Sequence, residues 1–432
     1  MRTVFSRAAL LIALLAPSPW IFAEEPLLLA PLLEEAREKN PELRALRERV
    51  ESLDARTRAI GRLDDPTLKI ELEDLSTDRP LDISPDDAML TRYTFSQMLP
   101  FPGKLRLRER IASKEALSAR AELSSRTLDV SQMIKEAFFD YAFLDESVRI
   151  NMGIKELLLD AAKTAEARYA TGQVPQQDVL KLNVERSMVT NEIIALEAEK
   201  EVAAARLKSL LDRPQKSELA SPGELPKERA AFDTNELIDT AVASSPDVKM
   251  AEAAAQAGEL GADLAGKNYY PDFMVGIAPI QRDGRFDNYD LMFQMNIPIW
   301  RGKYDSQAKE AKAAATSARS RLANEKNRKG FEVKSAAIQV GASDRARELY
   351  ETTLIPQVEL SYESALRNYQ AGKIDLITLL DTERELRRTR IEYLRTILGY
   401  NKRLAALERA VGADIRKGAT SLESTGVADM TE

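Results

Sequence analysis

The chain has 432 residues, a formal net charge of −7, no cysteine and no histidine. Without cysteine it can form no disulfide and no lipidated N-terminal cysteine, and without histidine it lacks the commonest imidazole ligand and general base. A mildly acidic chain with interspersed charges is also a poor binder of nucleic acid, so composition argues against that class of partner.

Residues 1–23 have the pattern of a secretory signal peptide. They begin with Arg2 and Arg7, continue with an apolar run over residues 8–16, and end in the small residue Ala23 before two glutamates. An N-terminal membrane anchor is the alternative, but the run is shorter than the ~20 residues that a membrane-spanning helix needs. We expect an exported chain that is not lipidated.

The first elements of the exported chain are a helix and two strands. Residues 27–62 are amphipathic with a helical period, and Pro41 divides them because proline is tolerated at the start of a helix and not inside it. Residues 66–75 and 89–99 change to a period of two, with apolar side chains on one face and polar ones on the other. Each of these segments predicts a strand of about ten residues.

A long helical hairpin is predicted next, over residues 103–211. Residues 103–169 contain no proline and would form a helix about 100 Å long at ~1.5 Å per residue. The return helix is expected from Pro175 to Leu211. Apolar residues in both helices recur at steps of three and four, a spacing that packs helices by knobs into holes.

The second half of the chain repeats this plan. The first repeat comprises residues 24–212, a linker rich in proline, serine and charge comprises residues 213–232, and the second repeat comprises residues 233–412, before a polar tail at 413–432. The second repeat is predicted to contain, in order, a helix at 234–267, strands at 271–281 and 288–299, and a long hairpin at 302–411 whose first helix runs from Gly302 to Tyr369. A repeat of about half the chain length indicates an internal duplication.

The two predicted hairpin tips carry matching sequences. Tyr169 precedes Gly172 by three residues, and Tyr369 precedes Gly372 by the same spacing. A glycine between two long helical patterns is typical of the point where a helix ends and the chain reverses. The sequence therefore predicts two equivalent tips.

The four predicted strands have two interpretations. They could form a small water-soluble sheet packed on helices, or they could belong to a membrane barrel with lipid outside and water inside. Four strands are too few to close a barrel around a channel, since membrane barrels begin at about eight. A barrel would therefore have to be shared between chains.

This order of elements, duplicated behind a signal peptide, resembles the TolC family of outer-membrane efflux ducts. The resemblance implies a mainly helical fold with a β-barrel contribution: a homotrimer with a twelve-stranded barrel in outer-membrane lipid and a periplasmic helical tunnel. It also implies docking to a periplasmic adaptor and an inner-membrane pump in a Gram-negative bacterium. The segment 96–105 resembles relatives that work with heavy-metal pumps of the resistance-nodulation-division type.

The same resemblance assigns a gate at the tips. The family's tyrosine corresponds to Tyr369, its inner acidic ring to Asp381, and the acidic partner on the first hairpin to Asp178. Two family positions depart, because Ile374 replaces a basic residue and Thr378 replaces a second acid, so we expect a thinner polar latch. The alternative is that both aspartates are ordinary solvated charges on helix surfaces.

Adaptor contact is assigned to the exposed tips, and no catalytic, cofactor or metal site is predicted. The tip residues are Gly172, Gln173, Val174, Gly372, Lys373 and Ile374. Only carboxylates and methionines remain as metal ligands, and Met292 and Met295 lie on opposite faces of one predicted strand.

We expect a passive exit duct for solutes, with heavy-metal cations as the first choice of cargo and drugs or a secreted polypeptide as the others. The rival from a different class is a soluble periplasmic coiled-coil adaptor or scaffold. Such an adaptor would be expected to carry one hairpin flanked by compact β-domains. The sequence instead predicts two hairpins and four strands in matched pairs.

Overall fold

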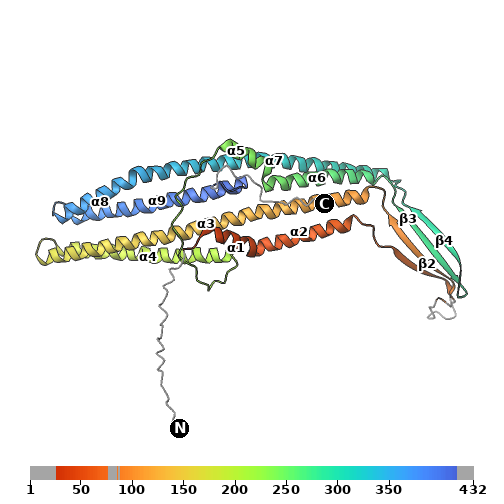
Figure 1. The fold of residues 1–432 in the computed structure, drawn as a ribbon, viewed down its shortest axis with the longest axis horizontal. Helices are drawn as coiled ribbons and strands as arrows, with labels where there is room; N and C mark the ends of the chain where they lie inside the picture. Colours follow the sequence, from red (N-terminus) through yellow and green to blue (C-terminus); the bar gives the residue numbers. More distant parts are fainter. Residues whose placement is uncertain (1–25, 76–84, 86–87, 416–432) are drawn as a thin grey trace, which may run out of the picture.

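The computed structural model describes residues 26–75, 85 and 88–415. The molecule is an elongated rod of helices with a β-sheet at one end and two hairpin tips at the other (Figure 1). The predicted signal peptide and nearly all of the predicted polar tail lie outside the described residues.

Both halves contain two short helices, two strands and a long hairpin. The first half consists of α1 (Leu29–Lys39), α2 (Pro41–Ile60), β1 (Thr67–Leu75), β2 (Ala88–Leu99), α3 (Lys104–Ala170) and α4 (Gln176–Leu210). The second half consists of α5 (Thr234–Ser244), α6 (Pro246–Lys267), β3 (Phe273–Arg282), β4 (Arg285–Met295), α7 (Arg301–Leu349), the π-helical turn η1 (Tyr350–Leu354), α8 (Ile355–Gln370) and α9 (Leu376–Val411).

Equivalent caps explain why α2 and α6 begin at prolines. The Asn40 side chain accepts hydrogen bonds from the backbone N–H groups of Glu42 and Leu43, and Ser245 accepts one from Val248. Each capping residue directly precedes a proline at the first helical position. Proline lacks a backbone N–H, but an N–H at this position would have no partner within the helix, so no hydrogen bond is lost.

Two predicted elements of the second half need correction. The expected helix from Gly302 to Tyr369 is present as an unbroken helical segment, but it is not uniformly α-helical, because the π-helical turn η1 lies between α7 and α8 just before Pro356. A proline ring clashes with the carbonyl four residues earlier, and the wider turn relieves that clash. The expected strand 288–299 is shifted, since β4 begins at Arg285 after a two-residue turn and ends at Met295. Asp283 and Gly284 both have positive φ in that turn (46° and 73°), the geometry of a tight hairpin.

The four strands form one antiparallel sheet in the order β1-β2-β3-β4. The β2–β3 pairing joins the two halves of the chain, with Phe95 opposite Ile277. Within the described residues, β1 and β4 each have a neighbour on one side only. The sheet therefore has two open edges.

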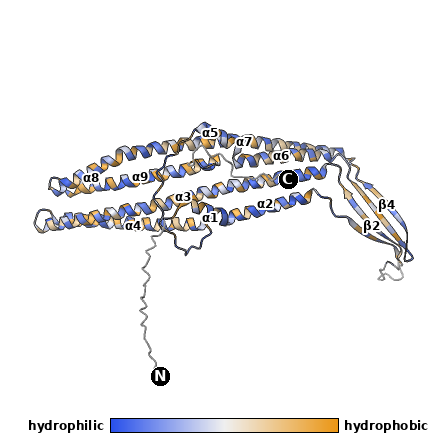
Figure 2. Ribbon diagram, in the orientation of Figure 1, coloured by the Kyte–Doolittle hydropathy of each residue, from blue (hydrophilic) through white to orange (hydrophobic). Residues whose placement is uncertain are grey.

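The helices are held by apolar clusters along the rod, and hydrophobic and hydrophilic residues are interspersed along their length (Figure 2). The cluster nearest the tips contains residues of both hairpins, among them Leu182 of α4 and Leu376 of α9. Among the described residues, none of the helices combines the length and the apolar composition needed to cross a lipid bilayer.

The linker between the halves crosses the middle of the rod as an extended chain. Its backbone is fixed by side chains of the second half. The N–H of Ala230 donates to the Tyr400 hydroxyl (2.8 Å), Asn401 donates to the carbonyl of Pro226 (2.9 Å) and Arg347 donates to the carbonyl of Lys227 (3.1 Å).

A buried ionic cluster joins four helices between the middle of the rod and the sheet. Asp247 of α6 contacts Ser125 of α3, Lys329 of α7 and Arg409 of α9. Asp247 and Lys329 are only 6 % and 2 % exposed. Burial acts to raise the pKa of Asp247, but the hydrogen bonds from Arg409, Lys329 and Ser125 outweigh it and hold that pKa well below its usual range.

Candidate functional site

One face of the sheet is a continuous apolar surface exposed to the surroundings. Leu68, Phe95, Ile277 and Leu291 lie opposite one another in a row across all four strands. Their exposed fractions are 54, 50, 45 and 76 %. Contiguous apolar surface of this kind marks a site that contacts lipid or another protein.

The opposite face of the sheet carries charged and polar side chains. Arg92 of β2 forms ion pairs with Glu73 of β1 and with Asp290 of β4, the latter at 3.5 Å. Thr94 lies beside Arg92 on the same strand and is nearly buried. The two faces therefore have the division expected of a strand between lipid and water.

The two hairpin tips share one backbone conformation. Gly172 and Gly372 have the same φ of 72°, and each N–H donates to the carbonyl of the tyrosine three residues before it, at 2.9 and 3.0 Å. A side chain at that φ would be strained, which explains the glycines. The four assigned tip residues around them differ in exposure, because Gln173 and Lys373 are exposed and Val174 and Ile374 are half-buried.

The tyrosines of the two tips differ in their surroundings. Tyr169 is 47 % exposed, whereas Tyr369 is 3 % exposed. The Arg168 guanidinium from the first tip lies 5.4 Å from the centre of the Tyr369 ring and donates a hydrogen bond to the Tyr369 carbonyl (3.0 Å). Burial raises the pKa of the Tyr369 hydroxyl, and the nearby Asp178 charge adds to the rise.

Among the described residues, the Tyr369 hydroxyl has no hydrogen-bond partner. The structure thus brings Tyr369 and Asp178 into electrostatic reach of each other without a hydrogen bond between them. Asp381 stands apart from both, with a side chain 65 % exposed and an ion pair to Arg384 at 3.4 Å.

Ion pairs join the two hairpins a few helical turns away from the tips, in the direction of the sheet. Glu185 of α4 is 2 % exposed and pairs with both Arg384 and Arg387 of α9. Arg387 also pairs with Glu192 of α4. Each buried partner would be costly to leave alone, so these contacts hold the two hairpins side by side.

The two positions that depart from the family gate have other tasks. Ile374 packs against the apolar cluster shared by the hairpins. The backbone N–H of Thr378 donates to the Asp375 carboxylate (3.0 Å), which caps the N-terminus of α9. Polar contacts between the two hairpins are made near these positions by Arg168, Glu185 and Arg387.

Comparison with known proteins identifies the architecture. The family described as outer membrane efflux proteins matches residues 32–213 and 237–413, most of the chain and one segment in each half. The chain belongs to this outer membrane efflux protein family. The predicted resemblance to TolC-like channels is thereby confirmed.

Individual relatives of this efflux protein are distant. The cobalt-zinc-cadmium resistance protein CzcC of Cupriavidus metallidurans is 24 % identical over 339 residues, which cover 76 % of this chain and 79 % of CzcC. The outer-membrane channel OprN superposes with a TM-score of 0.77 at 18 % identity, covering 89 % of this chain and 90 % of OprN. CusC superposes with a TM-score of 0.76 at 17 % identity, covering 95 % of this chain and 99 % of CusC. These two similarities support the fold.

Two residues of this efflux protein that link its hairpins, Arg168 and Glu185, were missed by sequence reasoning. Each contacts residues about half the chain length away, and neither its type nor its spacing distinguishes it from other charged residues of long helices. Glu383, which lines a cavity between the hairpins, was missed for the same reason. The internal repeat is the one sequence feature that could have indicated such residues, because it aligns the first tip with the second and so draws attention to residues near Tyr369.

Proposed function

We propose that three copies of this chain form an exit duct in the outer membrane, with a twelve-stranded barrel and a helical tunnel reaching into the periplasm. The observation that carries the proposal is the open four-stranded sheet with one exposed apolar face and one polar face, in a chain of the outer membrane efflux protein family. Pairing β1 of one copy with β4 of the next removes both open edges and turns every apolar row outward.

The oligomer test is a mass and location measurement. Membranes of cells producing the natural chain are fractionated, extracted in mild detergent and analysed by light scattering corrected for bound detergent. The duct predicts a trimer in the outer-membrane fraction with residues 1–23 removed. A monomer in the soluble periplasmic fraction would favour the coiled-coil scaffold instead.

The proposed partners are a periplasmic adaptor and an inner-membrane pump of the resistance-nodulation-division type, with the adaptor held at the two tips. The six assigned tip residues lie at the end of the rod farthest from the sheet, in accord with this role. Heavy-metal cations are the proposed cargo, supported by the relative CzcC, which is named for resistance to cobalt, zinc and cadmium.

The cargo test compares growth on these metals and on organic toxins. Deletion of the gene for this chain is expected to lower tolerance to cobalt, zinc or cadmium, and the natural gene is expected to restore it. Loss of tolerance to organic toxins alone would replace metals by drugs as the cargo.

We also propose that the tips form the gate, with Tyr369 and Asp178 in the latch and three copies of Asp381 around the pore. Like charges around a narrow opening repel each other and attract cations. Arg168 is added to this latch because it holds the Tyr369 ring and carbonyl.

The gate test is single-channel conductance in a planar bilayer. Tyr369→Phe combined with Asp178→Ala is expected to raise conductance, and Arg168→Ala is expected to do the same. The matched control is Tyr169→Phe, because this tyrosine has the equivalent place in the other tip and is exposed. Equal conductance of the natural protein and both latch variants would refute the latch.

A further inference from the structure

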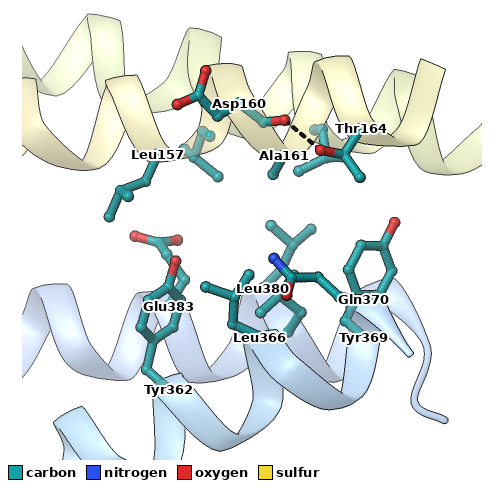
Figure 3. Close-up of a pocket in the computed structure, with 13 residues that line it drawn as sticks. Leu157, Asp160, Ala161, Thr164, Tyr362, Leu366, Tyr369, Gln370, Leu380 and Glu383 are labelled. Carbon is teal, nitrogen blue, oxygen red and sulfur yellow. Dashed lines mark hydrogen bonds between the residues drawn. The ribbon is translucent and has the colours of Figure 1, made fainter. Parts of the chain in front are cut away.

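A cavity of about 140 Å³ lies between the two hairpins, close to their tips. Its walls come from α3 and α4 on one side and from α8 and α9 on the other (Figure 3). Most of the lining is apolar and is supplied by leucines: Leu157, Leu158, Leu182, Leu366, Leu379 and Leu380. An apolar cavity of about 150 Å³ accommodates one benzene ring, so this cavity has room for one small ring.

The polar side chains in the cavity wall that are buried, Glu383 and Tyr369, come from the second hairpin, whereas Asp160 and Thr164 of the first hairpin are exposed. Glu383 is 2 % exposed and Tyr369 is 3 % exposed, and among the described residues both Glu383 oxygens and the Tyr369 hydroxyl lack hydrogen-bond partners. Figure 3 shows Glu383 and Tyr362 reaching toward Leu157 of the first hairpin. A buried carboxylate without hydrogen bonds is costly, so the site calls for a partner.

The charged groups around Glu383 leave its charge poorly compensated. Arg387 Nε lies 3.4 Å from Glu383 Oε1, but the same guanidinium already pairs with Glu185 and Glu192 of α4. Arg384 is likewise paired with Glu185. The excess of carboxylates over guanidinium groups in this cluster favours the entry of a cation.

None of the described lining residues is a lysine or an arginine. Of the nearby cations, Arg168 is engaged with the ring and the carbonyl of Tyr369, and Arg390, which acts on Tyr362, pairs with Glu359. On α3 the exposed Asp160 pairs with Lys163 at 3.1 Å, and its carboxylate points away from the cavity. On α8 the Tyr362 ring borders the cavity, and its pKa is raised by burial and by Glu383. Burial is the main cause that raises the pKa of Glu383 to about 7; the Arg387 charge opposes the rise and the Glu185 charge adds to it.

We propose that this cavity is a binding site for a small organic ammonium ion, whose apolar part occupies the leucine-lined space and whose charged group pairs with Glu383. Aromatic faces favour such cations, and the Tyr362 ring lines the site beside Glu383, whereas the Tyr369 ring already has the Arg168 guanidinium 5.4 Å from its centre. A bare metal ion fits less well, since the described residues contain no group of three carboxylate, histidine or cysteine side chains arranged to hold one. A neutral apolar ligand would fill the space but leave Glu383 unpaired.

The described lining residues of the site come from both hairpins of one chain. A bound ammonium ion would touch helices of both hairpins and stabilise their close packing. The cavity is reachable from solvent, because the lining residues Leu157, Thr164 and Gln370 are exposed. Binding can therefore be measured on the purified protein, whether or not the protein conducts.

The test is isothermal titration calorimetry with benzylammonium as the probe and toluene as its neutral counterpart. Benzylammonium is expected to bind about tenfold more weakly at pH 6 than at pH 8, because a carboxyl with a pKa of about 7 is largely protonated at pH 6. Glu383→Gln is expected to reduce affinity at pH 8 at least tenfold and to abolish the pH dependence. Leu157→Trp, at the exposed mouth, is expected to block binding by occupying the space.

The matched control is Asp381→Asn, which removes an exposed acid of the same helix and is expected to leave binding within twofold. No binding of benzylammonium at millimolar concentration would overturn the proposal. Equal affinity for toluene and benzylammonium, or full affinity in Glu383→Gln, would also overturn it. Failure of this site would leave the trimeric duct unaffected, because the duct is tested by mass, location and conductance.

Discussion

Removing one charge from the buried ionic cluster should destabilise the whole rod. In Asp247→Asn the amide retains the size of the carboxyl and a bond to Ser125, but Lys329 and Arg409 lose their shared counter-ion. Breaking a buried ion pair typically costs about 3–5 kcal/mol. Here Lys329 keeps Glu332 at 2.9 Å and Arg409 keeps Asp129, so we expect the lower end of that range, about 3 kcal/mol.

The assay is thermal unfolding of the purified protein in detergent, followed by circular dichroism. Glu259→Gln is the matched control, because Glu259 lies on the same helix and pairs with Arg319 on α7 while both side chains are about half exposed. Such a surface pair contributes about 0–1 kcal/mol. Equal unfolding temperatures for Asp247→Asn and Glu259→Gln would refute the reasoning.

The cluster also predicts the response to acid. The pKa of Asp247 is depressed in the folded protein, so its stabilising contribution is complete above the unfolded value near 4 and is lost as pH falls below it. The natural protein should lose stability in that acid range more steeply than Asp247→Asn does. Parallel curves for the two proteins would count against Asp247 as the source.

Two further predictions concern Glu383 and the sheet. The pKa of Glu383 is raised to about 7, so the contribution of this group to folding stability is complete below the unfolded pKa of 4.5 and is lost as pH rises to 7. Between pH 5 and pH 8 the free energy of unfolding of Glu383→Gln should therefore rise by about 2–3 kcal/mol relative to that of the natural protein, as measured by thermal unfolding. A stability difference that does not change with pH would contradict this. Leu291→Arg, on the apolar face, should reduce the yield of protein in outer-membrane fractions, whereas Gln294→Arg, on the opposite face of the same strand, should not. Equal yields would contradict the assignment of the faces.

The sequence predicts the elements well where local chemistry decides them. Asn40 and Ser245 before prolines fix helix starts, Gly172 and Gly372 fix the tips, and the alternation over the strands fixes which face is apolar. These features depend on a few neighbouring residues. They are therefore readable without knowledge of the fold.

The contacts between the hairpins could not be predicted in the same way. Whether a given acid on a long helix becomes exposed, as Asp381 does, or buried, as Glu185 does, depends on which side of the helix meets the other hairpin. Whether the acid is buried therefore depends on packing between segments that are far apart in the sequence. The π-helical turn before Pro356 has a local cause, because a proline inside a helix disturbs the turn that precedes it.

The open sheet has a consequence for the order of assembly. A lone chain in water carries an uncovered apolar face together with unpaired backbone groups along β1 and β4, a combination that invites irregular aggregation. The apolar clusters of the helices form within one chain and do not depend on protein concentration, whereas in the proposed duct the sheet gains its partners only from other copies and from lipid. For such a duct, assembly competes with aggregation, and the yield of assembled protein depends on the concentration of unassembled chains.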